Sequence, residues 1–315
     1  MQKGEEMPNK SELQTTGQHS GRARGEVLSL SAPLPSPLHP MTIAHTVPAS
    51  PFSPAQAALL ALRCLDITSL KEDDSEASIT ALAARAATAH GGPAALCVYP
   101  AWVPTARREL DARGLAAVRV ATVVNFPRGE SSPEAVVAEV GAALALGADE
   151  IDVVFPWRAL QGGDTQAGAA LLCQVRLACD AGPRGAGVVP LKVILETGEL
   201  QDPALIAAAC RTALAAGADF LKTSTGKTAH HASPQAVATM LAEIEADGRR
   251  AGLKVSGGVG RLEEVQTYLA LAAATYGAEA LNPTRLRFGA SSLLPALVAV
   301  LDGQTAAPAA AAGSY

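Results

Sequence analysis

Aromatic residues are scarce in this sequence. Only 3% of its 315 residues are Phe, Trp or Tyr, whereas 49% are hydrophobic. The core must therefore be built from Ala, Leu, Val and Ile, a composition that suits helices packed closely on a sheet. The length fits one large domain or two small ones, and an α/β barrel of about 250 residues forms a single domain.

Long basic runs and long apolar runs are also absent. The formal net charge is −5 and no cluster of Lys or Arg stands out, which excludes a broad electrostatic surface for nucleic acid or membrane. No charge-free apolar run reaches about 18 residues. Glu5, Glu6 and Glu12 lie where a targeting peptide would be basic and then apolar. We therefore expect no membrane span and no signal or transit peptide, and an anionic substrate would need a local pocket.

Cysteine and histidine follow no pattern typical of a metal site. There is no CxxC motif and no paired Cys/His spacing for zinc, and an odd, scattered set of cysteines indicates reduced thiols in a cytoplasmic protein. His230 and His231 are adjacent, but no third ligand has helical or strand spacing to them, which favours exposed loop histidines over a metal site. The cysteines are Cys64, Cys97, Cys173, Cys179 and Cys210.

The two ends of the chain differ in composition from its centre. Residues 1–53 are rich in Ser, Thr, Pro and Gly and show no sustained hydrophobic period. Such a segment cannot bury enough apolar surface to fold, so we predict a disordered extension. Met41 opens a less charged segment and is an alternative start to Met1. Residues 304–315 are predicted to form a flexible Ala-rich tail, which leaves 54–303 as the folded domain.

From residue 54 onward, strand-like and helical segments alternate at intervals of roughly 25 to 35 residues. Ala-rich amphipathic segments such as Pro133–Leu146 and Pro203–Ala216 open with Pro just after Ser or Asp, as a helix N-terminus prefers. Eight such units predict an α/β fold, a parallel (β/α)8 TIM barrel. An open doubly wound sheet is the alternative, although no Gly-x-Gly-x-x-Gly fingerprint supports it. The predicted strands are Cys64–Thr68, Ala95–Tyr99, Arg119–Phe126, Glu150–Phe155, Leu191–Glu196, Asp219–Ser224, Leu253–Ser256 and Arg285–Phe288.

A short motif recurs before three of these strands. It is Gly-Ala-Asp at 147–149 and at 217–219, and Gly-Ala-Glu at 277–279. In each copy the glycine can end the preceding helix with a left-handed residue. Asp152 lies as far along the chain from the glycine of the first copy as Lys222 lies from the glycine of the second. A carboxylate and an amine therefore occupy equivalent strand positions. Both are predicted to point into the barrel, because helices cover its other face.

Lys222 is the central candidate for chemistry because it lies inside an apolar, β-prone run. Burial and a nearby cation lower the pKa of a lysine and free its amine to attack a carbonyl. Lys254, on the next strand, supplies that cation, and Asp152 is placed to move protons. The alternative is an ion network that merely fills the barrel. We expect Asp66 to orient Lys222 or the substrate.

A second charged pair lies in the fifth predicted strand. Lys192 and Glu196 are spaced to share one face, which predicts an ion pair between them. A purely structural role for this pair is an equally good interpretation.

Glycine-rich segments after the last strands indicate a phosphate site. Ser256–Gly260 follows the seventh predicted strand, and Phe288–Ser292 follows the eighth and leads into an apolar helix. Glycine lets backbone N–H groups approach an anion, and a helix N-terminus adds donors. In barrels these two loops commonly bind phosphate, and a charged Lys227 at the rim would complete the site. The predicted phosphate-binding residues are Gly226, Lys227, Gly257, Gly258, Gly289, Ser291 and Ser292.

Together the motifs resemble those of the 2-deoxyribose-5-phosphate aldolase family, from about residue 62 to 315. The motifs are Leu65-Asp66-Ile67-Thr68, Cys97-Val98-Tyr99-Pro100, Asn125-Phe126-Pro127, Glu150-Ile151-Asp152-Val153-Val154-Phe155-Pro156, Glu196-Thr197-Gly198-Glu199-Leu200, Lys222-Thr223-Ser224-Thr225-Gly226-Lys227 and Arg287-Phe288-Gly289-Ala290-Ser291-Ser292.

This resemblance implies a class I aldolase that needs neither metal nor cofactor. Its reaction is the reversible cleavage of 2-deoxy-D-ribose 5-phosphate to acetaldehyde and D-glyceraldehyde 3-phosphate, in deoxynucleoside catabolism. The resemblance matches the Schiff-base lysine to Lys222 and the proton-transfer pair to Asp152 and Lys254. Thr225 and Cys97 are predicted to lie beside these residues in supporting positions. Small phosphorylated sugars and aldehydes are then the partners, and the sequence leaves a homo-oligomer open.

Two other functions are compatible with the residues alone. One is a different Schiff-base barrel aldolase, of the transaldolase or fructose-bisphosphate type. The other is a non-catalytic phosphosugar-binding protein, which the presence of all three central charged residues argues against.

One feature of the sequence departs from the family pattern, and another is a further likeness to it. Many members have Gly-Gly-Val-Arg where this chain has Gly257-Gly258-Val259-Gly260-Arg261, which leaves backbone contacts to a phosphate there. Tyr315 resembles a terminal tyrosine of family members, whose flexible tail can approach the site.

Overall fold

The computed structural model describes residues 47–182, 188–248 and 251–304. Of the predicted disordered extension, 1–53, residues 1–46 lie outside the described residues, and these include Met41. Residues 47–53 form neither helix nor strand before the first helix. In the predicted tail only residue 304 is described, so Tyr315 also lies outside.

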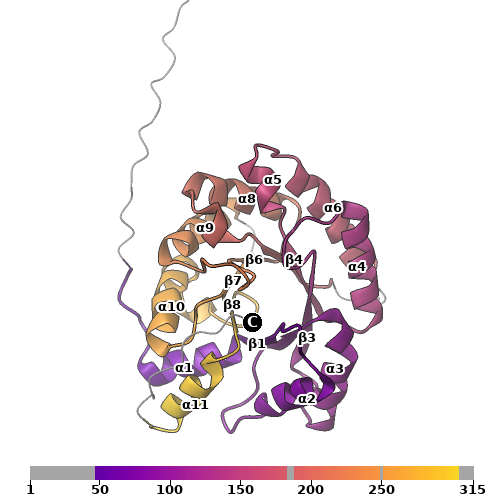
Figure 1. Ribbon diagram of the computed structural model, residues 1–315. Coiled ribbons are helices and arrows are strands. Elements are labelled where there is room, and N and C mark those ends of the chain that lie inside the picture. The colour runs from indigo at the N-terminus through magenta and orange to yellow at the C-terminus, as the bar shows by residue number, and fades with distance from the viewer. Residues whose placement is uncertain (1–46, 183–187, 249–250, 305–315) are drawn as a thin grey trace, which may run out of the picture. The chain divides into compact units, whose positions relative to one another are not determined.

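The described residues form a closed barrel of eight parallel strands in chain order, with β8 pairing back onto β1. Figure 1 shows the strands at the centre with helices around them. The predicted (β/α)8 fold is confirmed, and each predicted strand overlaps an observed one. The strands are β1 (Leu65–Ser69), β2 (Ala95–Val98), β3 (Arg119–Val124), β4 (Glu150–Val154), β5 (Leu191–Ile194), β6 (Phe220–Lys222), β7 (Gly252–Ser256) and β8 (Leu286–Ala290).

The helices outside the barrel begin where the capping residues predict. Ser132, Asp202 and Ser233 each accept a hydrogen bond from a backbone N–H of the first turn, and Pro follows each of them. The described helices are α1 (Pro54–Arg63), α2 (Glu76–Arg85), α3 (Val103–Ala112), α4 (Pro133–Ala145), α5 (Trp157–Gln161), α6 (Ala167–Asp180), α7 (Thr197–Leu200), α8 (Pro203–Ala215), α9 (Pro234–Asp247), α10 (Leu262–Tyr276) and α11 (Leu293–Leu301), with 3₁₀ turns η1 (Pro100–Trp102) and η2 (Ala278–Ala280). None of the described helices is long and apolar enough to cross a membrane.

The predicted glycine turns are present before β4 and β6. Gly147 and Gly217 have φ of 95° and 87°, and their N–H groups donate to Leu144 and Leu214 in the last turn of the preceding helix. The third copy was predicted wrongly as a direct turn into the last strand. Gly277 also has a positive φ, of 82°, but η2 and residues 281–285 separate it from β8.

The barrel has an apolar outer layer and a mixed interior. Ala, Leu, Val and Ile from strands and helices fill the space between the two rings, as the scarcity of aromatic residues predicts. Inside, β2 and β3 contribute a separate wall of small side chains, including Ala95, Cys97, Ala121 and Val123. Small residues on this wall leave room for long charged side chains from the other strands.

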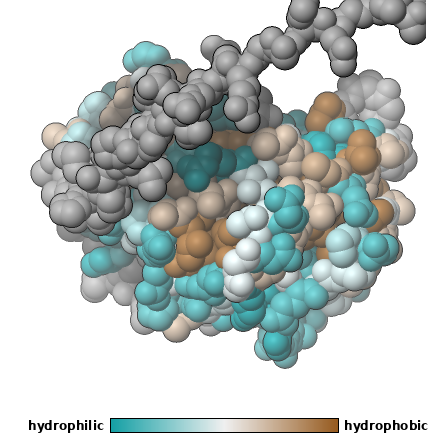
Figure 2. Space-filling model, turned by 90° about the horizontal axis from the view of Figure 1, so that it is seen from above, coloured by the Kyte–Doolittle hydropathy of each residue, from teal (hydrophilic) through white to brown (hydrophobic). Residues whose placement is uncertain are grey.

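The described surface carries few large exposed apolar side chains. On the face seen in Figure 2, hydrophilic residues are interspersed with apolar ones. The large exposed apolar residues among those described are Val47, Leu146, Leu177 and Val188.

Candidate active site

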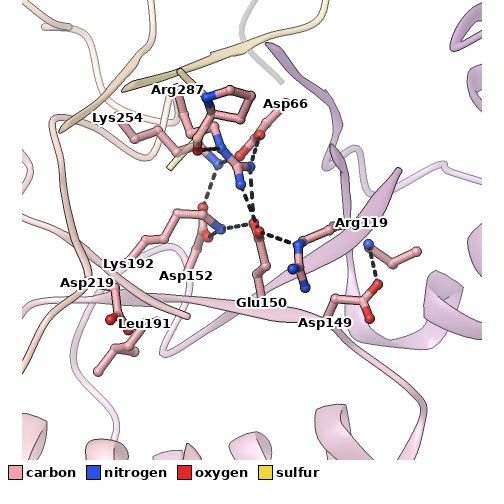
Figure 3. Close-up of polar contacts among 12 residues, drawn as sticks. Asp66, Arg119, Asp149, Glu150, Asp152, Leu191, Lys192, Asp219, Lys254 and Arg287 are labelled. Atoms are coloured by element: carbon pink, nitrogen blue, oxygen red, sulfur yellow. Dashed lines mark hydrogen bonds and ion pairs between the residues drawn. The ribbon is translucent and has the colours of Figure 1, made fainter. Parts of the chain in front are cut away.

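Charged side chains from six strands meet inside the barrel. Figure 3 shows Asp152, Lys192 and Glu150 at the centre of these contacts, with Arg287 and Asp66 beside them. None of the residues in this group, which we call the charged network, is more than 5% exposed. Because a buried charge needs a partner of opposite charge, each of these side chains is held in position by its charged neighbours. The charged network consists of Asp66, Glu150, Asp152, Lys192, Lys222, Lys254 and Arg287.

Asp152, on β4, joins three lysines. Its Oδ1 accepts from Lys192 Nζ at 2.6 Å, while its Oδ2 accepts from Lys222 Nζ at 2.9 Å and Lys254 Nζ at 2.8 Å. Burial opposes ionisation of this carboxyl, but the lysines around it, Lys192 most of all, outweigh this effect and hold the pKa of Asp152 well below its usual range. Of the three residues predicted to carry the chemistry, Lys222 and Lys254 therefore both lie within hydrogen-bonding distance of Asp152.

The two lysines that share Oδ2 differ in their electrostatics. Lys222 and Lys254 are paired in the parallel register of β6 and β7. For Lys222, burial and the charge of Lys254 lower the pKa despite the attraction of Asp152. For Lys254, burial is outweighed by Asp152 and Asp66, which raise the pKa well above its usual value. The two neighbouring lysines thus have pKa values shifted in opposite directions, and Lys222 is the one shifted toward the neutral amine.

The charges of the network balance when Lys222 is neutral. Three cations then face three carboxylates, each within 3.2 Å of a partner of opposite charge. A proton on Lys222 would add an uncompensated buried charge, which is costly. The cations are Lys192, Lys254 and Arg287, and the carboxylates are Asp66, Glu150 and Asp152.

The predicted Lys192–Glu196 ion pair is wrong. Lys192 Nζ lies 2.7 Å from Glu150 and 2.6 Å from Asp152 instead. The prediction assumed that strand alternation continues to residue 196, whereas β5 ends at Ile194 and Glu196 has a left-handed φ of 57°. The Glu196 carboxylate bonds to Thr225, and burial raises the pKa of Glu196.

Sequence reasoning missed Glu150 and Arg287 as members of the charged network. Arg287 Nη1 lies 2.7 Å from Asp66, and its Nη2 lies 2.9 Å from Glu150. Two signals were present, because Glu150 lies two residues before Asp152 on the same strand face, and Arg287 interrupts an apolar strand. Arg119, which is 53% exposed, approaches Glu150 at 3.6 Å from the outside.

The supporting residues take positions around the lysines. Asp66 bonds to Lys254 at 2.6 Å and to Arg287 at 2.7 Å. Its role in orienting Lys222 or the substrate stays a prediction. Cys97 lies in the small-residue wall, where burial raises the pKa of its thiol.

The residues predicted to bind phosphate lie in or after the last residues of three neighbouring strands, β6, β7 and β8. Gly226, Gly257 and Gly258 have φ of 80°, 80° and 74°, a conformation that suits glycine. Gly289 lies within β8, Ser291 follows it, and Ser292 precedes the first residue of α11. The structure therefore brings these segments to one rim of the barrel.

Lys227 lies at the same rim and is half-buried. Its Nζ donates to the Leu70 carbonyl at 2.7 Å, and burial lowers its pKa. Its predicted position at the rim agrees with the structure, whereas its charge state stays a prediction.

The two histidines after β6 have different surroundings. His230 is exposed, as predicted, and lies 3.6 Å from Glu199. His231 is half-buried, contrary to that prediction, because its side chain packs against Gly257 and Gly258, where an added Cβ would lie 3.0 and 3.3 Å from the nearest atom of His231. Among the described residues, no group of three or more His, Cys, Asp or Glu side chains is arranged to hold a metal ion.

Comparison with known proteins places this geometry in a family. A model described as DeoC/LacD family aldolase matches residues 61–298, which include every strand of the barrel. The chain belongs to the DeoC/LacD aldolase family. This membership confirms the resemblance predicted from the motifs, and the whole charged network of this DeoC/LacD aldolase lies in the matched region.

Solved structures agree with the family assignment. A candidate deoxyribose-phosphate aldolase of Toxoplasma gondii is 27% identical, with a TM-score of 0.71, over 81% of this chain and 99% of that one. One of Coccidioides immitis is 28% identical, with a TM-score of 0.68, over 82% and 92%. The deoxyribose phosphate aldolase of Aeropyrum pernix, described as tetrameric, has 24% identity and a TM-score of 0.61 over 79% and 92%, and supports the fold.

Proposed function

We propose that this family member is a deoxyribose-phosphate aldolase that acts through a Schiff base on Lys222. The observation that carries the proposal is the placement of Lys222. Its amine is buried on β6, shares Asp152 Oδ2 with the ammonium group of Lys254, and belongs to a network whose charges balance only when it is neutral. A neutral amine is the form that attacks a carbonyl.

The first step joins Lys222 to the substrate. Its nitrogen lone pair adds to C1 of the open-chain aldehyde of 2-deoxy-D-ribose 5-phosphate, and loss of the C1 oxygen as water leaves an iminium ion. The ammonium group of Lys254 lies on the same carboxylate oxygen and serves as the proton donor that makes this oxygen a better leaving group.

The second step breaks the bond between C2 and C3. A base removes the proton of the C3 hydroxyl, C3 becomes the aldehyde of D-glyceraldehyde 3-phosphate, and the electron pair of the broken bond moves into the iminium ion to give an enamine. Protonation at C2 and addition of water then release acetaldehyde and the free amine. One proton leaves the C3 hydroxyl and one arrives at C2, so no net proton is consumed.

Asp152 and Lys254 are the proposed carriers of these protons, through a water molecule. Asp152 is held ionised by its three lysine neighbours, and Lys254 is held protonated by Asp66 and Asp152. An ionised carboxylate next to an ammonium group provides an acceptor and a donor at one place. We further propose that the rim formed after β6, β7 and β8 binds the 5-phosphate, so that C1 reaches Lys222.

Covalent trapping tests the proposal. Acetaldehyde and borohydride should reduce the Schiff base to a stable secondary amine that adds the mass of an ethyl group, and peptide mapping should locate it on Lys222. A label on any other lysine, or no label, would refute the assignment. A panel of deoxyribose 5-phosphate, fructose 1,6-bisphosphate and transaldolase substrates then distinguishes this function from that of other Schiff-base aldolases.

A further inference from the structure

Glu196 is a buried carboxylate that the proposed chemistry does not use. It lies between the end of β5 and the start of α7, is fully buried and has a left-handed φ of 57°. A non-glycine residue in this conformation is strained, and such strain clusters at functional sites. The backbone turn directs the chain out of the strand at this point, so Glu196 does not continue the face that carries Lys192.

All the hydrogen bonds of the Glu196 carboxylate described here go to the loop after β6. Oε2 accepts from Thr225 Oγ1 at 2.5 Å, and both oxygens lie 3.3 Å from the Thr225 backbone N–H. Oε1 also accepts from Thr228 Oγ1 at 3.3 Å. One carboxylate therefore binds both ends of a four-residue loop segment.

Thr225 connects the Glu196 carboxylate to the backbone that follows it. Its Oγ1 donates to Glu196 and accepts from the backbone N–H of Lys227 at 3.1 Å. Between Thr225 and Lys227, Gly226 has a φ of 80°, a left-handed conformation that suits glycine. The contacts thus run from Glu196 to Thr225 to Lys227, and the loop segment that contains Thr225 follows Lys222 after two intervening residues.

We propose that Glu196 is a positioning residue for the substrate's phosphate group. It acts through Thr225, which holds the Lys227 N–H and so fixes the backbone at Gly226 between them. This inference rests on the proposed function and adds a residue that determines preference for phosphorylated substrates. Backbone N–H groups bind an anion well only when they are held in place, because disorder in the loop would add an entropic cost to binding.

The chemistry of the contacts requires a carboxylate at position 196. The hydroxyl and the backbone N–H of Thr225 both donate to Glu196, and a carboxylate can accept at both oxygens. Glutamine would keep one acceptor oxygen but would place an NH2 group against a donor. Alanine would remove both acceptors and leave the buried Thr225 N–H without its partner.

The experiment compares Glu196→Gln, Glu196→Ala, Thr225→Val and Thr225→Ser with the unmodified chain. We expect Glu196→Ala and Thr225→Val to raise the KM for deoxyribose 5-phosphate at least about tenfold, while kcat/KM for unphosphorylated 2-deoxyribose changes less than about twofold. Thr225→Ser keeps the hydroxyl and should restore the KM. The double variant should be no worse than either single one, because both remove the same contact.

Glu199→Gln is the matched control. Glu199 lies three residues away in α7, is partly exposed and pairs with the exposed His230. We expect it to leave both kinetic constants and folding unchanged. Circular dichroism identifies any variant that fails to fold, and the comparison of Thr225→Val with Thr225→Ser still decides the question if both Glu196 variants are lost.

Two readouts separate this inference from the proposed function. Trapping with acetaldehyde and borohydride needs no phosphate, so its absence in the unmodified chain contradicts the proposed function. Binding of sn-glycerol 3-phosphate, measured by calorimetry, needs no Schiff base and should weaken in Glu196→Ala and Thr225→Val. Unchanged binding in both variants, no binding to the unmodified chain, or an equal loss with both sugars would overturn the role of Glu196.

Discussion

Lys222 and Lys254 face each other across neighbouring strands and donate to the same carboxylate oxygen, yet their pKa values move in opposite directions. The difference comes from Asp66, which lies 2.6 Å from Lys254 and gives it a second anionic partner. Lys222 has one ion-pair partner among the described residues, which it shares with two other lysines. Burial therefore dominates for Lys222, and carboxylate attraction dominates for Lys254.

Replacement of the proposed nucleophile should separate activity from folding. We expect Lys222→Met to abolish acetaldehyde trapping and to lower aldol cleavage by at least about 1,000-fold, because covalent catalysis is lost. The remaining network keeps three cations and three carboxylates, so the free energy of unfolding should fall by no more than about 1 kcal/mol. Trapping assays and denaturant unfolding check both parts. Residual trapping, or a large loss of stability, would contradict this picture.

Removal of the neighbouring ammonium group should change the pH dependence of trapping. In Lys254→Leu the lowering effect of a nearby cation on the Lys222 pKa is gone, and Lys222 becomes the cation needed to balance the carboxylates. The trapping rate should then rise only at higher pH than in the unmodified chain. We also expect cleavage to fall by about 100- to 10,000-fold, the range typical of a lost proton donor. A pH profile that does not move would reject the electrostatic effect of Lys254 on Lys222.

Glu150 should matter for stability, although sequence reasoning did not single it out. Glu150→Gln leaves Lys192 and Arg287 with one carboxylate fewer inside the barrel. Breaking a buried ion pair in this way costs about 3–5 kcal/mol of unfolding free energy. Glu263→Gln, on the exposed first turn of α10, is the control and should change it by less than about 0.5 kcal/mol. Similar values for the two variants in urea unfolding would show that the pair contributes little.

Acid should unfold the barrel through its buried carboxyl groups. The pKa values of Asp66 and Asp152 are lowered in the folded chain by the neighbouring cations, against the opposing effect of burial. A carboxyl with a lowered folded pKa stabilises the fold above its unfolded value of about 3.9, and this contribution is lost as the pH falls. We expect the free energy of unfolding to decrease steadily from about pH 5 downward. Urea titrations between pH 7 and pH 3 measure it, and a flat profile would contradict the expected linkage.

The Lys222 and Lys254 variants together distinguish a catalytic network from a purely structural one. If Lys222 is the nucleophile and Lys254 tunes it, trapping disappears in the first variant and only shifts in pH in the second. If the charged network merely fills the barrel, neither variant alters trapping.

Local signals in the sequence determined the fold class and the identity of the central residues. Capping residues, glycine turns and alternating apolar segments act over a few residues, so the eight strands were predictable within a few residues at their ends. The inward placement of Asp152 and Lys222 followed from their equal distances to Gly147 and Gly217, because parallel strands of a barrel repeat the same geometry.

The tertiary structure alone decided which charges pair and which lysine has a lowered pKa. Glu150, Lys192 and Arg287 come together from β4, β5 and β8, and no spacing along the chain reports a distance across the barrel. Glu196 shows the same limit, since one left-handed residue after β5 redirected it from Lys192 to Thr225. Coulomb energies and burial depend on distances through space, which exist only once the eight strands have closed on one another.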